Sequence, residues 1–411
     1  MKFSKLSQLL LVSSIGLLVA TLFSACAITT IDFVYVACSA GSGTSSAGEI
    51  QTYAVDSQSG ALRTGQPTVS SGGVNPISMA VTSDYANLYV ANASAGHNSI
   101  VHFAIGLNGV LTAKDTLNIT GTPVSIAVNE ANTYLYVVSG PSPAVLAAYP
   151  LTSGTIGTAA SVKTLSLYGT YATYSGDVLV PTGISVLANN AAVYVTAYDQ
   201  SAYNPGCLSC ITSTANPGWV FGYTVGAGGI LTAIANPIEA GVKPTAIAAD
   251  PTNRFAYVTD YAQGQLIGYS IMSSSTLNPM PTGPFRAGDE PSAIVIDPRG
   301  KFIYVTNSLD STVSPYEIDL ATGSPSVTVN ATSTGGSNAT DTMPVAIAIE
   351  PALGRFVYTA NFLGNSVSGF RLDSTSGALS LTQSTPYPTG SKPTALIGIP
   401  HGNYSTQAVN P

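Results

Sequence analysis

One polar or charged residue stands directly before a recurring proline at four places along the chain. These residues are Asn75, Lys243, Glu290 and Lys392, and each follows a glycine by two positions. Only 8% of all residues are charged, so three charges at one repeated position are unusual. Ammonium, carboxylate and amide groups hydrogen-bond to carboxylates and hydroxyls. We therefore predict a polar ring that orients a carboxylate or hydroxylated ligand, with solvated loop charges as the alternative interpretation.

No complete catalytic or metal-binding pattern accompanies these residues. The three histidines are His97, His102 and His401, and their spacing assembles no nucleophile, base and acid. The sequence also lacks metal-ligand clusters, glycine-rich phosphate loops and calcium loops of the Asp-x-Asp-x-Asp-Gly type. We predict no metal and no cofactor, and no residue is assigned a catalytic role.

The recurring prolines belong to a repeat that organises the whole chain. In its clearest copy, residues 244–269, a short strand leads through the turn Asp250-Pro251-Thr252-Asn253 to a second strand and then a third. A repeat unit of about 47 residues suits a four-stranded blade. The strand-opening proline occurs seven times, at Pro76, Pro123, Pro181, Pro244, Pro291, Pro344 and Pro393. The second-strand tyrosine also occurs seven times, at Tyr35, Tyr89, Tyr136, Tyr194, Tyr257, Tyr304 and Tyr358.

The two series are out of step at the ends of the chain. Tyr35 has no proline strand before it, and the strand that begins at Pro393 has no second strand after it. One unit is therefore split between the ends, which favours a closed ring over an open solenoid with capping repeats. We predict an all-β, seven-bladed β-propeller over residues 32–400, with one blade closed by the N- and C-terminal strands. Residues 401–411 form a C-terminal tail.

The second strands carry a recognisable motif, as in Tyr257-Val-Thr-Asp260 and Tyr304-Val-Thr-Asn307. Together with the proline strand and the Asp-Pro turn, this motif resembles the Tyr-Val-Thr-Asn propeller repeat. It is also similar to the lactonase-type seven-bladed propellers, a group that includes 6-phosphogluconolactonase. The resemblance spans residues 32–400. It implies a propeller fold and the opening of a lactone at the mouth of the central channel.

The chain departs from the lactonase-type enzymes at one turn. Those enzymes often carry a His-Pro turn before the second strand, whereas this chain has Asp250-Pro251, Asp297-Pro298 and Glu350-Pro351. We interpret these acids as turn formers that cap the local backbone. No catalytic residue of the family is carried over to this sequence.

The first 25 residues are typical of a lipoprotein signal peptide. A basic start precedes a largely apolar run over residues 9–23, which is shorter than the ~20 residues that span a bilayer. The run ends in Leu22-Phe-Ser-Ala-Cys26, which resembles a bacterial lipobox and predicts lipidation of Cys26. An ordinary signal peptide is the alternative. Residues 26–31 would then form a short tether.

Two further cysteines lie close together in a loop rich in glycine, proline and serine, residues 202–218. Cys207 and Cys210 form a Cys-x-x-Cys pair, which predicts a local disulfide in an exported protein. Free thiols and a zinc site are the alternatives, and the two further ligands that zinc requires are not evident. Cys38 ends a strand and is expected to be a small buried residue.

Composition limits the classes of function. The formal net charge is −7, and this acidic balance argues against a nucleic-acid surface. We predict an exported scaffold of the cell envelope, periplasmic or on the surface, that meets the membrane through its lipid anchor. It would bind a glycan, a small molecule or an envelope protein. The alternative is a lactonase-type hydrolase that opens a sugar or other lactone, and the sequence leaves open whether the protein is an enzyme.

Overall fold

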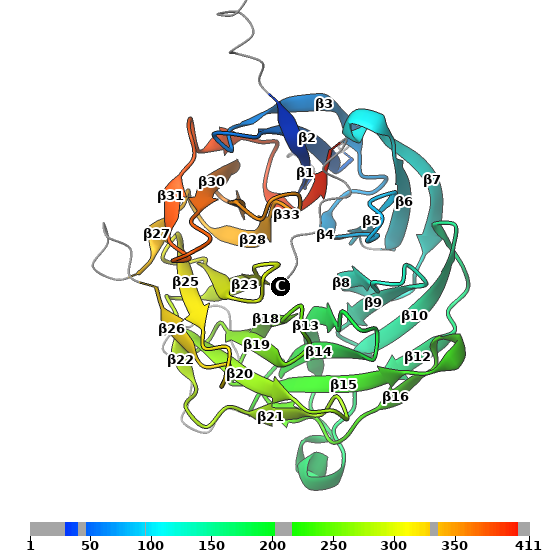
Figure 1. The fold of residues 1–411 in the computed structure, drawn as a ribbon. Coiled ribbons are helices and arrows are strands. Elements are labelled where there is room, and N and C mark those ends of the chain that lie inside the picture. Colours follow the sequence, from blue (N-terminus) through cyan, green and yellow to red (C-terminus); the bar gives the residue numbers. More distant parts are fainter. Residues whose placement is uncertain (1–28, 40–46, 95, 202–215, 329–335, 402–411) are drawn as a thin grey trace, which may run out of the picture.

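Seven antiparallel sheets are arranged around a central axis (Figure 1), so the predicted seven-bladed β-propeller is confirmed. The computed structural model describes residues 29–39, 47–94, 96–201, 216–328 and 336–401. The predicted signal peptide, Cys26, Cys207, Cys210 and most of the C-terminal tail lie outside these residues.

The blades are numbered from the first complete one along the chain, each from its inner strand outward. Blade 1 contains β4 (Pro76–Val81), β5 (Asn87–Asn92), β6 (Ser99–Ile105) and β7 (Leu111–Asn118). Blade 2 contains β8 (Thr122–Val128), β9 (Tyr134–Gly140), β10 (Val145–Thr152), β11 (Thr155–Ile156) and β12 (Ser161–Thr164). Blade 3 contains β13 (Leu179–Val186), β14 (Ala192–Asp199), β15 (Trp219–Val225), β16 (Leu231–Ala233) and β17 (Ile238–Glu239).

The second half of the ring repeats this arrangement. Blade 4 contains β18 (Pro244–Ala249), β19 (Phe255–Asp260), β20 (Gln265–Ile271), β21 (Leu277–Pro279) and β22 (Phe285–Arg286). Blade 5 contains β23 (Pro291–Ile296), β24 (Phe302–Asn307), β25 (Thr312–Ile318), β26 (Pro325–Val327) and β27 (Asn338–Ala339). Blade 6 contains β28 (Pro344–Ile349), β29 (Phe356–Asn361), β30 (Ser366–Leu372), β31 (Leu379–Leu381) and β32 (Tyr387–Pro388). Three short 3₁₀ turns complete the described part: η1 (Leu107–Gly109), η2 (Gly169–Tyr174) and η3 (Ala227–Gly229).

Blade 7 joins the two ends of the chain, as predicted. Its inner strand is β33 (Pro393–Pro400), and its outer strands are β1 (Thr30–Cys38), β2 (Glu49–Asp56) and β3 (Leu62–Ser70). Strand β1 pairs antiparallel with both β33 and β2, so the first described strand lies between the last strand and its own successor (Figure 1). Cys38 at the end of β1 is fully buried, which confirms the prediction for this residue.

The outermost strand differs from the expected single fourth strand. In blades 2 to 6 its place is taken by two short strands that both pair with the third strand, as β21 and β22 do with β20. The segment between β21 and β22 contains Pro281 and Pro284. Proline cannot donate to the ladder, so prolines interrupt the strand here.

The second-strand tyrosines tie neighbouring blades together. Six of them donate a hydrogen bond to a carbonyl in the turn between the third and fourth strands of the next blade. The pairs are Tyr35–Gly109, Tyr89–Gly154, Tyr194–Ser275, Tyr257–Gly323, Tyr304–Gly377 and Tyr358–Gly60. Tyr136 of blade 2 is the exception, because its hydroxyl is buried without a hydrogen-bond partner. The junction between blades 2 and 3 therefore lacks this tie.

The ring has two faces, which are named here by their connections. The mouth face carries the loops that enter the inner strands: residues 71–75, 119–121, 175–178, 240–243, 287–290, 340–343 and 389–392. The turn face carries the turns that follow the inner strands and those that follow the third strands. At the turn face, the carboxylates of Asp250, Asp297 and Glu350 accept hydrogen bonds from backbone N–H groups of their own turns. Their interpretation as turn formers is therefore confirmed.

Candidate functional site

The four predicted ligand-binding residues lie in equivalent loops of the mouth face. In each of them, the backbone carbonyl accepts a hydrogen bond from the residue that follows the second strand of the same blade. The pairs are Asn75–Ala93 (2.8 Å), Lys243–Tyr261 (2.9 Å), Glu290–Ser308 (2.9 Å) and Lys392–Ser39 (3.2 Å). The repeat thus places these four side chains at one level of the ring, in blades 1, 4, 5 and 7.

Lys243 lies between aromatic rings from two neighbouring blades. Its Nζ is 3.9 Å from the centroid of the Tyr261 ring and 5.7 Å from that of Tyr198, which belongs to β14 of blade 3. Ring faces attract a cation, and both rings also shield the ammonium group from water. Burial lowers the pKa of Lys243 to about 8, and the negative charge of Glu290 opposes this shift.

Asp260 fixes the loop that carries Lys243. Its carboxylate accepts hydrogen bonds from the backbone N–H groups of Val242 (3.1 Å) and Lys243 (2.9 Å) and from the side chain of Gln265 (3.0 Å). Gly241 has a φ of +71°, and a Cβ at this position would lie 2.1 Å from the Asp260 carboxylate. Only glycine fits such a contact together with a positive φ. Asp260 is therefore a positioning residue for Lys243.

Glu290 lies on the adjacent blade, next to Lys243 in the ring. Its φ is +56°, and the Ser308 hydroxyl donates to its backbone carbonyl (3.0 Å) and to its carboxylate (3.3 Å). A residue in this left-handed region is held by its surroundings. Lys243 and Glu290 thus form a pair of opposite charges across the junction of blades 4 and 5, which we call the Lys243–Glu290 pair.

Asn75 and Lys392 form a second, separate part of the ring. Ser39 links them, because its backbone N–H donates to the carbonyl of Lys392 and its hydroxyl donates to the Asn75 side chain (2.6 Å). Lys392 is exposed, with its Nζ 5.7 Å from the centroid of the Phe362 ring. Blade 6, which presents Met343 at the equivalent position, lies between Lys392 and Glu290. The four predicted residues therefore fall into two pairs rather than one even ring.

The two tyrosines beside Lys243 were not predicted from the sequence. Tyr261 directly follows the Tyr-Val-Thr-Asp motif, so its closeness to Lys243 follows from the repeat. Tyr198 sits on the preceding blade, and only the ring closure brings it to Lys243.

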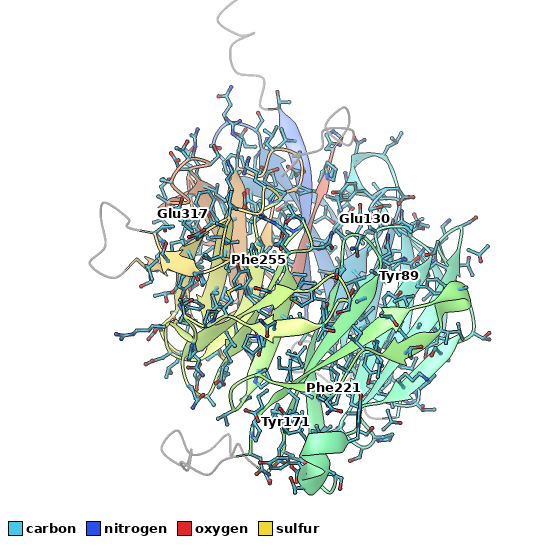
Figure 2. All side chains as sticks on the ribbon, turned by 60° about the horizontal axis from the view of Figure 1, so that its bottom comes forward. Tyr89, Glu130, Tyr171, Phe221, Phe255 and Glu317 are labelled. Atoms are coloured by element: carbon cyan, nitrogen blue, oxygen red, sulfur yellow. The ribbon has the colours of Figure 1, made fainter. Side chains whose placement is uncertain are left out.

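The segment that connects blades 2 and 3, residues 165–178, contacts the described end of the loop that carries Cys207 and Cys210. Asn216, in this described end, donates hydrogen bonds to Asp177 (3.2 Å) and Asp199 (2.6 Å). In η2, Tyr171 packs edge-on against the buried Trp219, with ring centroids 4.5 Å apart. Figure 2 shows Tyr171 near the strand that carries Phe221. Tyr171 also lines a cavity of about 190 Å³ whose walls are mainly apolar.

A larger cavity of about 530 Å³ lies against blade 2 and reaches the mouth loop at Thr120. Hydroxyl groups of Thr120, Ser139 and Ser142 line it, without a charged residue. Among the described residues, no group of three His, Cys, Asp or Glu side chains is placed to hold a metal ion. The Lys243–Glu290 pair thus offers an ammonium group and a carboxylate, which can stabilise charge and transfer protons. The cavity of blade 2 offers only neutral hydrogen-bonding groups.

Residues 236–404 match the family model described as Lactonase, 7-bladed beta-propeller. The matched segment contains Lys243, Asp260, Glu290 and Lys392. The resemblance read from the Tyr-Val-Thr-Asn repeat is therefore confirmed.

Solved structures with the same fold span nearly the whole chain. The periplasmic gluconolactonase of Pseudomonas aeruginosa is 17% identical, with a TM-score of 0.72 over 90% of this chain and 99% of that one. A Bacteroides uniformis protein that carries the name 6-phosphogluconolactonase is 17% identical, with a TM-score of 0.70 over 90% and 100% of the two chains. A hypothetical selenium-binding protein of Sulfolobus tokodaii is 12% identical, with a TM-score of 0.65 over 94% and 96%. At these identities the likeness establishes the fold alone. Among curated protein sequences, none matches this chain.

Proposed function

We propose that this protein is a lactonase-type hydrolase whose reaction takes place at the Lys243–Glu290 pair on the mouth face. The observation that carries the proposal is the placement of a half-buried ammonium group, held between Tyr198 and Tyr261, beside a carboxylate on the next blade. The family match over residues 236–404 supplies the reaction class.

Lactone hydrolysis needs a group that stabilises the oxyanion and a group that transfers a proton, and the two charges can fill these roles. Water attacks the carbonyl carbon, the negative charge moves to the carbonyl oxygen, and the bond between that carbon and the ring oxygen then breaks. Lys243 as an ammonium stabilises the oxyanion, because a fixed cation in a poorly solvated site acts more strongly than in water. Glu290 accepts the proton of the attacking water and returns it to the departing ring oxygen. The products are a carboxylic acid and an alcohol on one molecule.

The same proposal includes the location of the protein. The apolar leader and Leu22-Phe-Ser-Ala-Cys26 support export and attachment to a membrane through a lipid on Cys26. No helix in the described ranges is long and apolar enough to cross a bilayer. A lactonase in the envelope would act on an extracytoplasmic lactone, such as a sugar lactone.

Turnover of a lactone panel by the purified full-length protein tests this function. Glucono-1,5-lactone, δ-valerolactone and γ-butyrolactone are assayed through the proton that each acid releases, against spontaneous hydrolysis. We expect turnover that falls about 100-fold or more in Lys243→Ala and Glu290→Gln. Lys114→Ala, an exposed lysine on the outer strand β7, is the matched control and should keep full activity.

The opposite result separates the two functions predicted from the sequence. If no lactone is turned over faster than in buffer, the hydrolase is wrong and the binding scaffold stands. Thermal-shift measurements with glycans and with gluconate then identify its ligand. Stabilisation by gluconate that Lys243→Ala abolishes would place ligand binding at the same residues.

A further inference from the structure

The chain enters the ring at the turn face. Thr30 is the first residue of β1 and pairs with Asp56, the last residue of β2, while the Thr29 carbonyl accepts a hydrogen bond from Ser57 in the turn that follows (2.9 Å). Strand β1 runs from there to Cys38 beside the mouth loop of Lys392. The tether that precedes residue 29 therefore joins the ring on the face opposite the Lys243–Glu290 pair.

The tether is too short to reach the other face. Cys26 precedes Thr30 by four residues, which span at most about 14 Å in extended form. The nine residues of β1 rise about 30 Å across the ring. A lipid on Cys26 therefore has to enter a bilayer that lies near the turn face. This step depends on the lipidation included in the proposed function.

Basic residues gather on the turn face in the sector next to the tether. The turns and strand ends of blades 4 to 7 at this face carry five exposed basic side chains, Arg254, Lys301, Arg355, Arg371 and Arg63, against three exposed acidic ones, Glu317, Asp319 and Asp373. We call the surface around the five basic side chains the basic sector. Lysines and arginines near the surface of an anionic membrane are attracted to it.

Apolar side chains are interspersed in the same sector. Leu320, which is 45% exposed, lies in the turn after β25, and Met272 lies exposed in the equivalent turn after β20. Arg254 donates a hydrogen bond to the Leu320 carbonyl (2.7 Å), so the charged and apolar groups are direct neighbours. Basic and apolar side chains on one surface are typical of proteins that rest in the membrane interface.

The mouth face has a different charge balance. Among the exposed side chains of its loops and strand ends, two are basic, Arg286 and Lys392, and three are acidic, Glu239, Asp289 and Asp310. Exposed apolar residues occur here too, Leu363 among them, so apolar exposure alone does not distinguish the faces. The tether position and the balance of exposed charges do distinguish them, because anionic headgroups attract a surface with an excess of exposed basic side chains.

We propose that the protein rests on an anionic phospholipid bilayer through the turn face, with the basic sector against the headgroups and the mouth face turned away. The Lys243–Glu290 pair then opens to the aqueous compartment, where a soluble ligand reaches it without crossing the lipid. The partner of this surface is the bilayer that holds the lipid anchor.

Tryptophan quenching by brominated lipid tests the orientation. The lipidated full-length protein is reconstituted on vesicles of brominated phosphatidylcholine with one quarter phosphatidylglycerol. Leu320→Trp on the turn face and Leu363→Trp on the mouth face are matched probes, at sites 45% and 56% exposed, and the native Trp219 is fully buried. We expect strong quenching of Leu320→Trp and none of Leu363→Trp. Quenching of Leu363→Trp alone, or of neither probe, would overturn the proposal.

Charge reversal tests the basic sector separately. Lys301→Glu, Arg355→Glu and Arg371→Glu together should reduce the quenching of Leu320→Trp on vesicles with phosphatidylglycerol, and 0.5 M salt should do the same to the parent. Equal quenching before and after reversal would exclude the basic sector as the contact. The anchor is judged independently by mass spectrometry of Cys26. An unlipidated Cys26 refutes the anchor, while the quenching pattern still reports which face meets the bilayer.

Discussion

The carboxyl group of Asp32 is buried against the carboxyl group of Glu350 where the ends of the chain close the ring. Asp32 is fully buried on β1 beside β33, where its carboxyl group meets the side chain of Glu350 and the backbone of Ala352. Burial and the neighbouring Glu350 raise the pKa of Asp32 to about 10. Burial also raises the pKa of Glu350, although two backbone N–H groups hydrogen-bond to it. The pair is stable with one proton between the two carboxyl groups.

This pair predicts that the ring loses stability as the pH rises. The folded-state pKa of Asp32 lies above its ordinary value of 3.8, so the folded protein binds the extra proton. The stabilisation is complete below about pH 4 and is lost progressively toward pH 10. Asp32→Asn replaces the proton by a permanent amide donor, so this variant should melt higher than the parent at pH 9 and about equally at pH 4.

Thermal unfolding followed by circular dichroism at pH 4, 7 and 9 measures this difference. Asp84→Asn, at an exposed turn of blade 1, is the control and should track the parent at each pH. Other carboxylates also titrate, so the comparison between Asp32→Asn and the parent is the decisive quantity. A constant difference in melting temperature across this pH range would contradict the shared proton.

The tyrosine ties predict unequal effects of one substitution at two equivalent positions. Tyr257→Phe removes the hydrogen bond to Gly323 (2.6 Å) and leaves that buried carbonyl unpaired, which should cost about 1–3 kcal/mol of unfolding free energy. Tyr136→Phe removes a buried hydroxyl that has no partner, and should leave stability unchanged or raised. Urea unfolding of both variants measures the contrast. Equal losses would show that the hydroxyl of Tyr136 is also paired.

This pair of tyrosines shows where sequence reasoning ends. The offset between the proline and tyrosine series predicts both the number of blades and the split blade, because a ring must join its ends. Tyr136 has the same place in its repeat as its six counterparts, so its missing partner is visible only when the blades are docked. Tyr198 is likewise distant from Lys243 in the repeat and close to it in the ring. Repeats predict contacts within a blade well, whereas contacts between different blades depend on how each junction packs.

Lys243 predicts the alkaline limit of activity. Its pKa is lowered to about 8, so a reaction that needs the ammonium form should decline as the pH passes about 8. Lys243→Arg keeps the positive charge at all relevant pH values and should move this limit upward, at the expense of a lower maximal rate. Glu290→Gln removes the charge that favours the ammonium, so any residual activity should decline at a lower pH. The measurement is kcat/KM between pH 6 and 10, and an unchanged limit in Lys243→Arg would remove Lys243 from this role.

Two glycines with the same backbone conformation test how the loop of Lys243 is positioned. Gly241 and Gly228 have φ values of +71° and +70°, so alanine carries a similar backbone cost of about 1 kcal/mol at both. At Gly228 nothing lies within 4 Å of the added Cβ, whereas at Gly241 the Asp260 carboxylate lies 2.1 Å away. Gly241→Ala should therefore lose more stability and also displace the carboxylate that holds the Lys243 backbone. We expect a drop in kcat for Gly241→Ala and none for Gly228→Ala, together with a larger loss in urea unfolding. Equal unfolding losses and equal kcat values would mean that Asp260 does not position Lys243.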